Sequence, residues 1–301
     1  MSIFANNYAL TFFIINLYLL TLKTLISMTW LSSSSIGRKV VMSVTGAALV
    51  LFLLFHATMN IFSITDAMFG VEYYNAICKF LGANWYALIA TVGLAFLVVV
   101  HIVYAFIITV QNYRARGKER YEVTDRQKDV EWASKNMLAL GIVVVLGIGL
   151  HLCNFWAKMQ LVELQHMLGA DVCHNALENA TNGVLIIKNT FANPIYVVLY
   201  IVWLGGLWFH LTHGVWSALH TMGWNNNTWM PRVKCISNVV STLVVVMFAA
   251  VVVFYFAASF CCTAECCAAH AHTCAEAVAP VIDTVQAVVE AVVDTVAVVA
   301  E

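Results

Sequence analysis

The stretch VVMSVTGAALVLFLLFHATMNIFSIT, residues 40–65, decides the fold of this chain. It lies between Lys39 and Asp66 and holds no charged residue. A helix needs about 20 predominantly apolar residues to cross a bilayer, so this stretch is long enough to span one. Its one ionisable side chain is His56. A histidine inside a membrane span is rare and points to a function.

Four further uncharged stretches of this kind follow. They lie between Lys79 and Arg114, Lys135 and Lys158, Lys188 and Arg232, and Lys234 and Glu265. Of the 301 residues, 62% are hydrophobic and 10% are charged, with a net charge of −1. Soluble domains carry about 25% charged residues, so the composition excludes an ordinary soluble domain. The near-neutral charge also argues against a nucleic-acid partner, which needs a basic stripe.

We therefore predict an all-α, polytopic membrane protein in which five transmembrane helices form a bundle. The stretches do not alternate apolar and polar residues as membrane barrel strands do. The expected spans cover residues 37–62, 84–111, 131–157, 194–221 and 231–258. Three of them begin at capping signals. These are Ser34 or Ser35 before the first span, Asn193 followed by Pro194 at the fourth, and Pro231 at the fifth.

Basic residues predict the orientation, because cytoplasmic loops hold an excess of Lys and Arg. One side of the expected bundle carries Arg38, Lys39, Arg114, Arg116, Lys118, Arg120, Arg126, Lys128, Arg232 and Lys234. The other side carries Lys79, Lys158 and Lys188. The N-terminal side of the first span is therefore expected in the cytoplasm and the C-terminal tail outside.

The spans form an expected membrane domain, residues 31–259, between two segments of different composition. Residues 1–30 are an apolar extension that fits a sixth helix, a signal anchor or untranslated upstream sequence; the last is favoured, with Met28 as the expected native start. Residues 260–301 are a tail in which five cysteines and two histidines precede valines at helical spacing. The Cys-Cys doublets match no common zinc spacing, so a disulfide-prone or lipid-proximal segment is expected, followed by an acidic amphipathic helix.

The deep histidines fall into two layers. His56 and His151 lie 17 and 16 residues from the cytoplasmic markers Lys39 and Lys135, about 25 Å at 1.5 Å per residue. His101 and His210 each lie 10 residues from the cytoplasmic ends of their spans, about 15 Å by the same rise. Each layer thus receives two histidines from different helices, and the fifth span has none.

Two imidazoles that face each other at one depth can fill both axial positions of a haem iron. The pattern predicts two stacked b-type haems, non-covalent because the chain has no Cys-x-x-Cys-His motif. His213 is an alternative to His210, since it lies three residues further on nearly the same face. Gly147 and Gly206, four residues before His151 and His210, are expected to leave room for the porphyrins. The competing interpretation is that each histidine is a hydrogen-bonded interhelical residue.

Several stretches resemble the dihaem cytochrome b subunit of succinate dehydrogenase/fumarate reductase, in its Bacteroidetes-like form. They are Ser33–Lys39, Met42–Gly46, Phe55–Asn60, Leu81–Tyr86, Val130–Met137 and Trp208–Gly214. The resemblance covers residues 30–258 and includes one ligand histidine on each of the first four spans. It leaves residues 1–27 and the tail after 259 outside.

The resemblance implies an electron-transfer subunit in a bacterial inner membrane that anchors a flavoprotein and an iron–sulfur protein. Electrons would pass between the iron–sulfur partner and menaquinone or a related quinone, and no dicarboxylate active site lies on this chain. His101 and His210 would hold the haem nearer the iron–sulfur partner, and His56 and His151 the distal one.

Further residues have roles under this resemblance. An acidic residue near the distal haem would handle a quinone proton, and Asp66 and Glu72 are the candidates. Independently of the resemblance, the basic loop between the second and third spans, with Arg38, Lys39, Arg232 and Lys234 nearby, is a candidate docking face for an electron-carrying partner or for haem propionates, although positive-inside topology explains these charges equally well. Trp208 stands where some family members have a glutamate for proton movement, so that path is in doubt.

Two other functions fit the same sequence. One is the cytochrome b anchor of another quinone-linked dehydrogenase, a formate dehydrogenase or a hydrogenase, although those often place two ligands on one helix. The other is a haem-free transporter or structural anchor that uses the histidines as proton relays.

Overall fold

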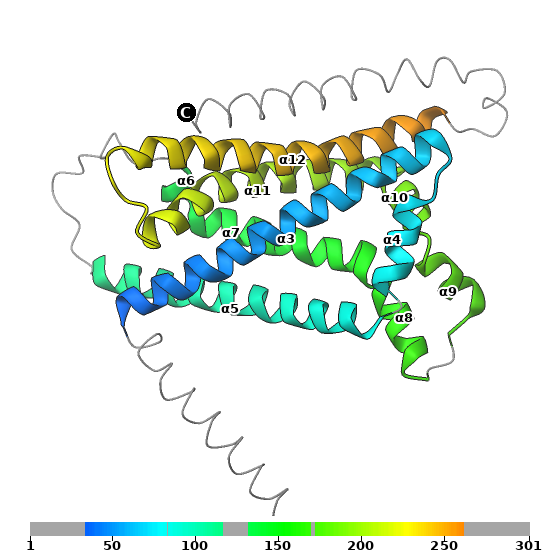
Figure 1. Ribbon diagram of the computed structural model, residues 1–301, viewed down its shortest axis with the longest axis horizontal. Helices are drawn as coiled ribbons and strands as arrows, with labels where there is room; N and C mark the ends of the chain where they lie inside the picture. The colour runs from blue at the N-terminus through cyan, green and yellow to red at the C-terminus, as the bar shows by residue number, and fades with distance from the viewer. Residues whose placement is uncertain (1–33, 83, 117–131, 170–171, 262–301) are drawn as a thin grey trace, which may run out of the picture.

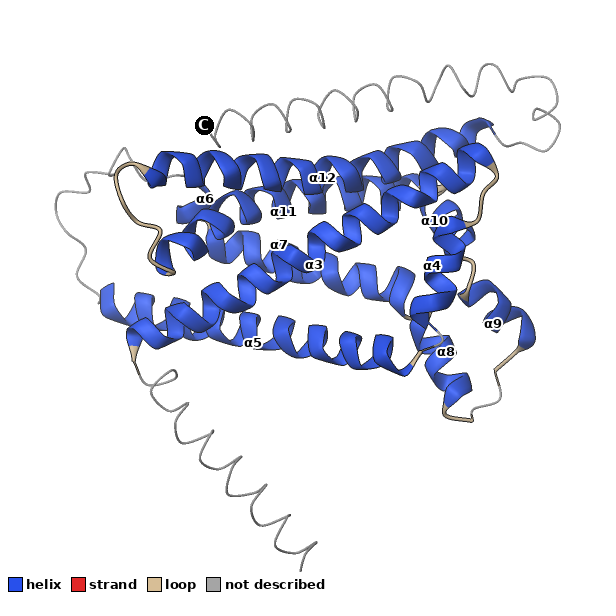
Figure 2. Ribbon diagram, viewed as in Figure 1, coloured by secondary structure: helices blue, strands red, loops and turns tan. Residues whose placement is uncertain are grey.

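The computed structural model describes residues 34–82, 84–116, 132–169 and 172–261. Within these segments the regular structure is helical throughout (Figure 1, Figure 2). Five stretches are long and apolar enough to cross a membrane. They are α3 (Ser35–Phe69), α5 (Trp85–Arg116), α7 (Met137–His151) with the π-helix η1 (Leu152–Trp156), α11 (Pro194–Thr221) and α12 (Trp229–Cys261). The predicted five-span, all-helical membrane architecture is confirmed.

Four short helices gather at one end of the bundle (Figure 1). They are α4 (Tyr73–Gly82), α8 (Gln160–Met167), α9 (His174–Ala180) and α10 (Gly183–Phe191), and we call this end the loop-helix end. The opposite end carries the short helix α6 (Trp132–Lys135) and the cations Arg38, Lys39, Arg114, Lys135, Arg232 and Lys234. We call it the basic end. The sequence analysis did not predict the four short helices.

The first and fourth spans begin as the capping signals predict. The Gly37 amide donates to Ser34 Oγ over 2.8 Å at the start of α3. Asn193 Oδ1 accepts from the Ile195 amide at 2.9 Å, and Pro194 opens α11. The fifth span begins two residues before Pro231, which still lies in the first turn, where its missing N–H costs no helical hydrogen bond.

The structure differs from the predicted spans in length and in continuity; α5, for example, runs past residue 111 to Arg116. α3 runs past residue 62 to Phe69, because Ser63 and Asp66 are buried against other elements, and it stops at Gly70 with φ +65°. The third span is interrupted: α6 and α7 are separated at Asn136, and η1 follows directly after His151. π-helical turns occur often at functional sites.

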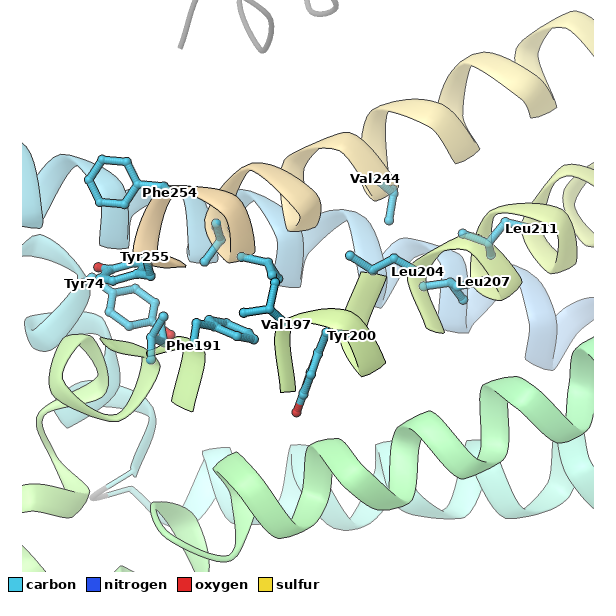
Figure 3. Packing of buried hydrophobic residues seen from close by; sticks show 13 residues of the cluster. Tyr74, Phe191, Val197, Tyr200, Leu204, Leu207, Leu211, Val244, Phe254 and Tyr255 are labelled. Carbon is cyan, nitrogen blue, oxygen red and sulfur yellow. The ribbon is translucent and has the colours of Figure 1, made fainter. Parts of the chain in front are cut away.

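The buried core joins α11 and α12 with the loop-helix end (Figure 3). Tyr200, Leu204 and Leu207 of α11 belong to this cluster, as do Val244, Val251 and Tyr255 of α12. α3 packs on both helices, whereas α5 packs mainly against α3. Large apolar side chains of α5 remain exposed, as expected for a surface that faces lipid. They are Ile89, Val92, Phe96, Val99 and Phe106.

The predictions for the N-terminal extension, the tail beyond Cys261 and the basic residues 118–128 lie outside the described residues.

Candidate functional site

The four deep histidines form two pairs. The ring centres of His56 (α3) and His151 (α7) are 5.9 Å apart, with 84° between the ring planes. The ring centres of His101 (α5) and His210 (α11) are 6.5 Å apart, with 70° between the planes. The structure thus brings together the same pairs that the sequence depths predict. Their role as haem ligands stays a prediction.

The pairs lie at two levels of the bundle. Thr45 Oγ1 is 3.1 Å from His101 Nδ1, so the His101–His210 pair lies beside Thr45 on α3. His56 follows Thr45 by eleven residues on the same helix, about 16 Å along its axis. We call the level of His101 and His210 the basic-end level and that of His56 and His151 the loop-helix level.

At the basic-end level, a hydroxyl determines the tautomer of His101. Thr45 Oγ1 donates its proton to the carbonyl of Val41 at 2.8 Å or of Met42 at 3.1 Å. With its proton on either carbonyl, the Thr45 oxygen is an acceptor for His101 Nδ1–H, and the backbone of Met42 also hydrogen-bonds to this imidazole; the Nδ1–H tautomer is assigned from this network. The Nε2 atom of His101 keeps its lone pair, the form that binds a metal.

His210 is the histidine of α11 that faces His101. Its Nδ1 atom is buried and has no hydrogen-bond partner among the described residues. The ring of His210 packs edge-on against that of His101, with 70° between the planes. The ring of His213 instead lies against Trp216, with centres 4.9 Å apart. The structure therefore favours His210 over His213 as the partner of His101.

At the loop-helix level, aromatic rings surround the histidines. His56 stacks on Phe52 with centres 5.4 Å apart and 12° between the planes, and Phe248 is 5.6 Å away. His151 contacts Phe155 at 5.1 Å and Trp203 at 5.9 Å. Phe155 belongs to η1, so the π-helix places one of the rings that flank His151.

An amide–phenol contact links the loop-helix level to α4. Asn60 Nδ2 donates to the His56 carbonyl at 2.8 Å and lies 3.4 Å from His56 Nδ1. Asn60 Oδ1 accepts from the Tyr74 hydroxyl at 3.3 Å. Tyr74 is buried, and burial raises the pKa of its phenol well above the ordinary value. The ring of His56 is therefore connected to the loop-helix end through two neutral polar groups.

The two glycines that precede His151 and His210 lie at the contact between α7 and α11. A side chain at Gly147 would collide with the indole of Trp203, and one at Gly206 would lie 2.7 Å from Val143 Cγ1. Trp203 Nε1 also donates to the Val144 carbonyl at 3.2 Å. The two glycines thus let α7 and α11 approach by accepting each other's large side chains. That these two glycines also leave room for a porphyrin stays a prediction.

The two acidic candidates line one cavity of about 330 Å³ at the loop-helix end. Asp66 is buried, and its carboxylate accepts from the amides of Tyr73 at 3.0 Å and Tyr74 at 2.7 Å. It therefore caps the first turn of α4. Glu72 is exposed at the same cavity, which Lys188 also lines.

Two other predicted residues lie away from the paired rings. Arg38 is in the first turn of α3, seven residues or about 10 Å before Thr45 along the helix. Trp208 Nε1 donates to Thr242 Oγ1 at 3.0 Å and so joins α11 to α12.

Sequence reasoning missed the partners of the histidines. Thr45, Trp203 and Tyr74 each act on a histidine or its neighbour from another helix. Their contacts could not be predicted from the sequence, because only the packing of separate helices brings them to the site.

Comparison of the chain with models of protein families, with curated proteins and with solved structures finds no match. The function is therefore inferred from the residues of the chain itself.

Proposed function

We propose that this chain is a membrane-anchor and electron-transfer subunit that carries electrons between an iron–sulfur partner and a membrane quinone. His101 with His210, and His56 with His151, would each hold one haem b. The observation that carries the proposal is the pairing of imidazoles from four helices at two levels, with ring centres 5.9 and 6.5 Å apart.

These separations suit two axial ligands of one metal. A metal–imidazole bond of about 2.0 Å puts the ring centre about 3 Å from the metal, so opposite axial rings have centres about 6 Å apart. Each pair offers two neutral nitrogen ligands. A structural zinc ion takes four protein ligands, whereas haem iron needs only axial ones from the protein. The donor set therefore fits haem better than a free ion.

When bound, haem supplies one-electron transfer. The residues of the chain hold and orient it. The hydroxyl of Thr45 keeps Nε2 of His101 available, and Trp203 packs α11 against α7 beside His151. The buried Nδ1 atom of His210 is consistent with a ring whose position is determined by a ligand on its other nitrogen.

The cavity at the loop-helix end is the proposed quinone-side site. Its volume of about 330 Å³ lies at the lower end of the range of about 300–1,000 Å³ for small-molecule sites. Glu72 is the proposed proton-handling acid, because Asp66 is engaged by the backbone of α4. By the positive-inside rule the basic end would face the cytoplasm and the iron–sulfur partner, in a bacterial inner membrane, and the cavity would face outside.

The sequence resemblance supports a succinate dehydrogenase or fumarate reductase complex, in which a flavoprotein subunit would complete the enzyme. The positions of the ligands, one histidine on each of four helices, disfavour an anchor of a formate dehydrogenase or a hydrogenase.

Purification and reduction with dithionite test the proposal. We expect a b-type spectrum and a haem content of two per chain, and copurification of a flavoprotein and an iron–sulfur protein. A chain purified with its partners but without haem would overturn the proposal in favour of a haem-free anchor or transporter. If the copurified partners oxidise formate or hydrogen, the haem proposal stands, and the assignment to a succinate dehydrogenase or fumarate reductase is overturned.

A further inference from the structure

The polar contact of the His101 ring differs from that of the His56 ring. At the basic-end level, Thr45 Oγ1 lies 3.1 Å from His101 Nδ1 and donates its own proton to the Val41 carbonyl at 2.8 Å, so in the Nδ1–H tautomer the Thr45 oxygen accepts a hydrogen bond from His101. At the loop-helix level, Asn60 Nδ2, a donor, lies 3.4 Å from Nδ1 and 3.5 Å from Nε2 of His56. The polar neighbour of the His101 ring is thus a hydroxyl oxygen, whereas that of the His56 ring is an amide nitrogen.

The hydrogen bond of Thr45 lies in a buried environment. The residue is 6% exposed, so water does not compete for its hydroxyl. The neighbouring Gly46 faces the same ring, since a Cβ there would lie 3.2 Å from His101 Cε1. α3 and α5 pack closely at this point. A buried hydrogen bond between packed helices holds a ring in one tautomer and one orientation.

We propose that Thr45 is a positioning residue that holds His101 with Nε2 directed to the metal and lowers the reduction potential of the haem at the basic-end level. The proposal rests on the proposed haem function. An acceptor on Nδ1–H makes the imidazole a stronger electron donor, and outer hydrogen bonds of this kind tune the metal. A stronger donor stabilises the oxidised iron more than the reduced iron, so the potential falls.

The test is a potentiometric titration of the purified complex carrying Thr45→Val, which keeps the shape of the side chain and removes the acceptor. We expect two haems, one with a raised potential and one unchanged. The expected shift corresponds to a change of about twofold to tenfold in the reduction equilibrium constant, the range of one hydrogen bond. Thr45→Ser should restore the original potential, because it keeps the hydroxyl.

Thr58→Val is the matched control. Thr58 is on the same helix and donates to the Leu54 carbonyl at 2.8 Å, as Thr45 does to Val41, but it is exposed. We expect this variant to leave both potentials unchanged. If Thr45→Val destroys the fold, Thr45→Ala provides the same comparison, with the ferric electron paramagnetic resonance signal of that haem as a second readout.

The outcomes separate the two proposals. Two haems with unchanged potentials in the Thr45→Val or Thr45→Ala variant would overturn the role of Thr45 and leave the electron-transfer function intact. An unsubstituted complex without haem would overturn the electron-transfer function itself. Equal shifts in the Thr45 and Thr58 variants would also overturn the role of Thr45, because they would indicate a general effect on α3.

Discussion

The two histidine pairs are chemically similar but lie in different surroundings. At the basic-end level, His101 is held by the hydroxyl of Thr45. At the loop-helix level, His56 and His151 lie among the rings of Phe52, Phe155 and Trp203. A buried polar acceptor and an aromatic shell affect a bound metal differently. The contrast teaches that one pair of residue types, repeated in one bundle, can be placed in two different environments, which would give the two proposed haems separate properties.

Loss of a ligand at either level tests whether the two centres are independent. Replacement of His151 by Ala removes one axial imidazole, so we expect loss of the haem at the loop-helix level and retention of the other. His101→Ala should do the converse. Haem content per chain and the reduced spectrum measure both results. Loss of both haems in both variants, with the chain still folded, would show that the levels are not separate sites.

Crowding at Gly147 tests whether the loop-helix level depends on the α7–α11 contact. Gly147→Ala would push against the indole of Trp203, and overpacking of this kind costs about 1–3 kcal/mol. We expect a lower melting temperature in detergent and preferential loss of the haem at the loop-helix level.

Gly149→Ala is the matched control for this effect, because nothing lies within 4 Å of the Cβ position there. It should keep both haems and the original melting temperature. A Gly147→Ala variant that behaves like the control would contradict the packing role of Gly147.

The hydrogen bond of the Trp203 indole is expected to contribute less to stability than the packing at Gly147. Trp203→Phe keeps an aromatic ring near His151 but removes the hydrogen bond to the Val144 carbonyl. We expect a loss of about 1 kcal/mol of stability, the usual net value of one hydrogen bond. Thermal unfolding in detergent measures it, and the haem at the basic-end level should be unaffected. An equal disturbance of both haems would count against separate surroundings.

The smallest expected effect concerns Glu163, at the loop-helix end. Burial raises the pKa of this carboxyl, one oxygen of which is buried without a partner among the described residues. An acid with a raised folded-state pKa loses stability as pH rises from its unfolded pKa through its folded one. Glu163→Gln removes that loss. The variant should therefore be slightly more stable than the parent at neutral pH, with no gain at pH values below about 4.5.

Melting temperature as a function of pH checks this prediction. Glu178→Gln is the control, since Glu178 is exposed on the neighbouring α9. A Glu163→Gln chain that is less stable than the parent at neutral pH would show that the ionised carboxylate is stabilised by a partner.

The number of spans could be predicted from the sequence because hydropathy is a local property. Each uncharged stretch is long enough to cross a bilayer whatever its neighbours do. The pairing of His56 with His151, and of His101 with His210, was predictable for a similar reason. Helical rise is constant, so a residue count from a span end is a depth.

The surroundings of the histidines could not be predicted in this way. Trp203 fills the space over Gly147 only because α7 and α11 pack together, and Thr45 meets His101 only because α3 lies beside α5. The break at Asn136 and the π-helix after His151 also have no clear signal in an apolar run. The sequence does not distinguish Asp66 from Glu72 as the acidic candidate. The structure does, because backbone amides at the start of α4 donate to the carboxylate of Asp66.

The sequence by itself thus determined how many helices cross the membrane and at which depths the four imidazoles lie, because both depend on spacing along one chain. The tertiary structure decided which side chains touch those imidazoles. Contacts between helices depend on their rotation and approach, and the order of residues along one helix does not contain that information.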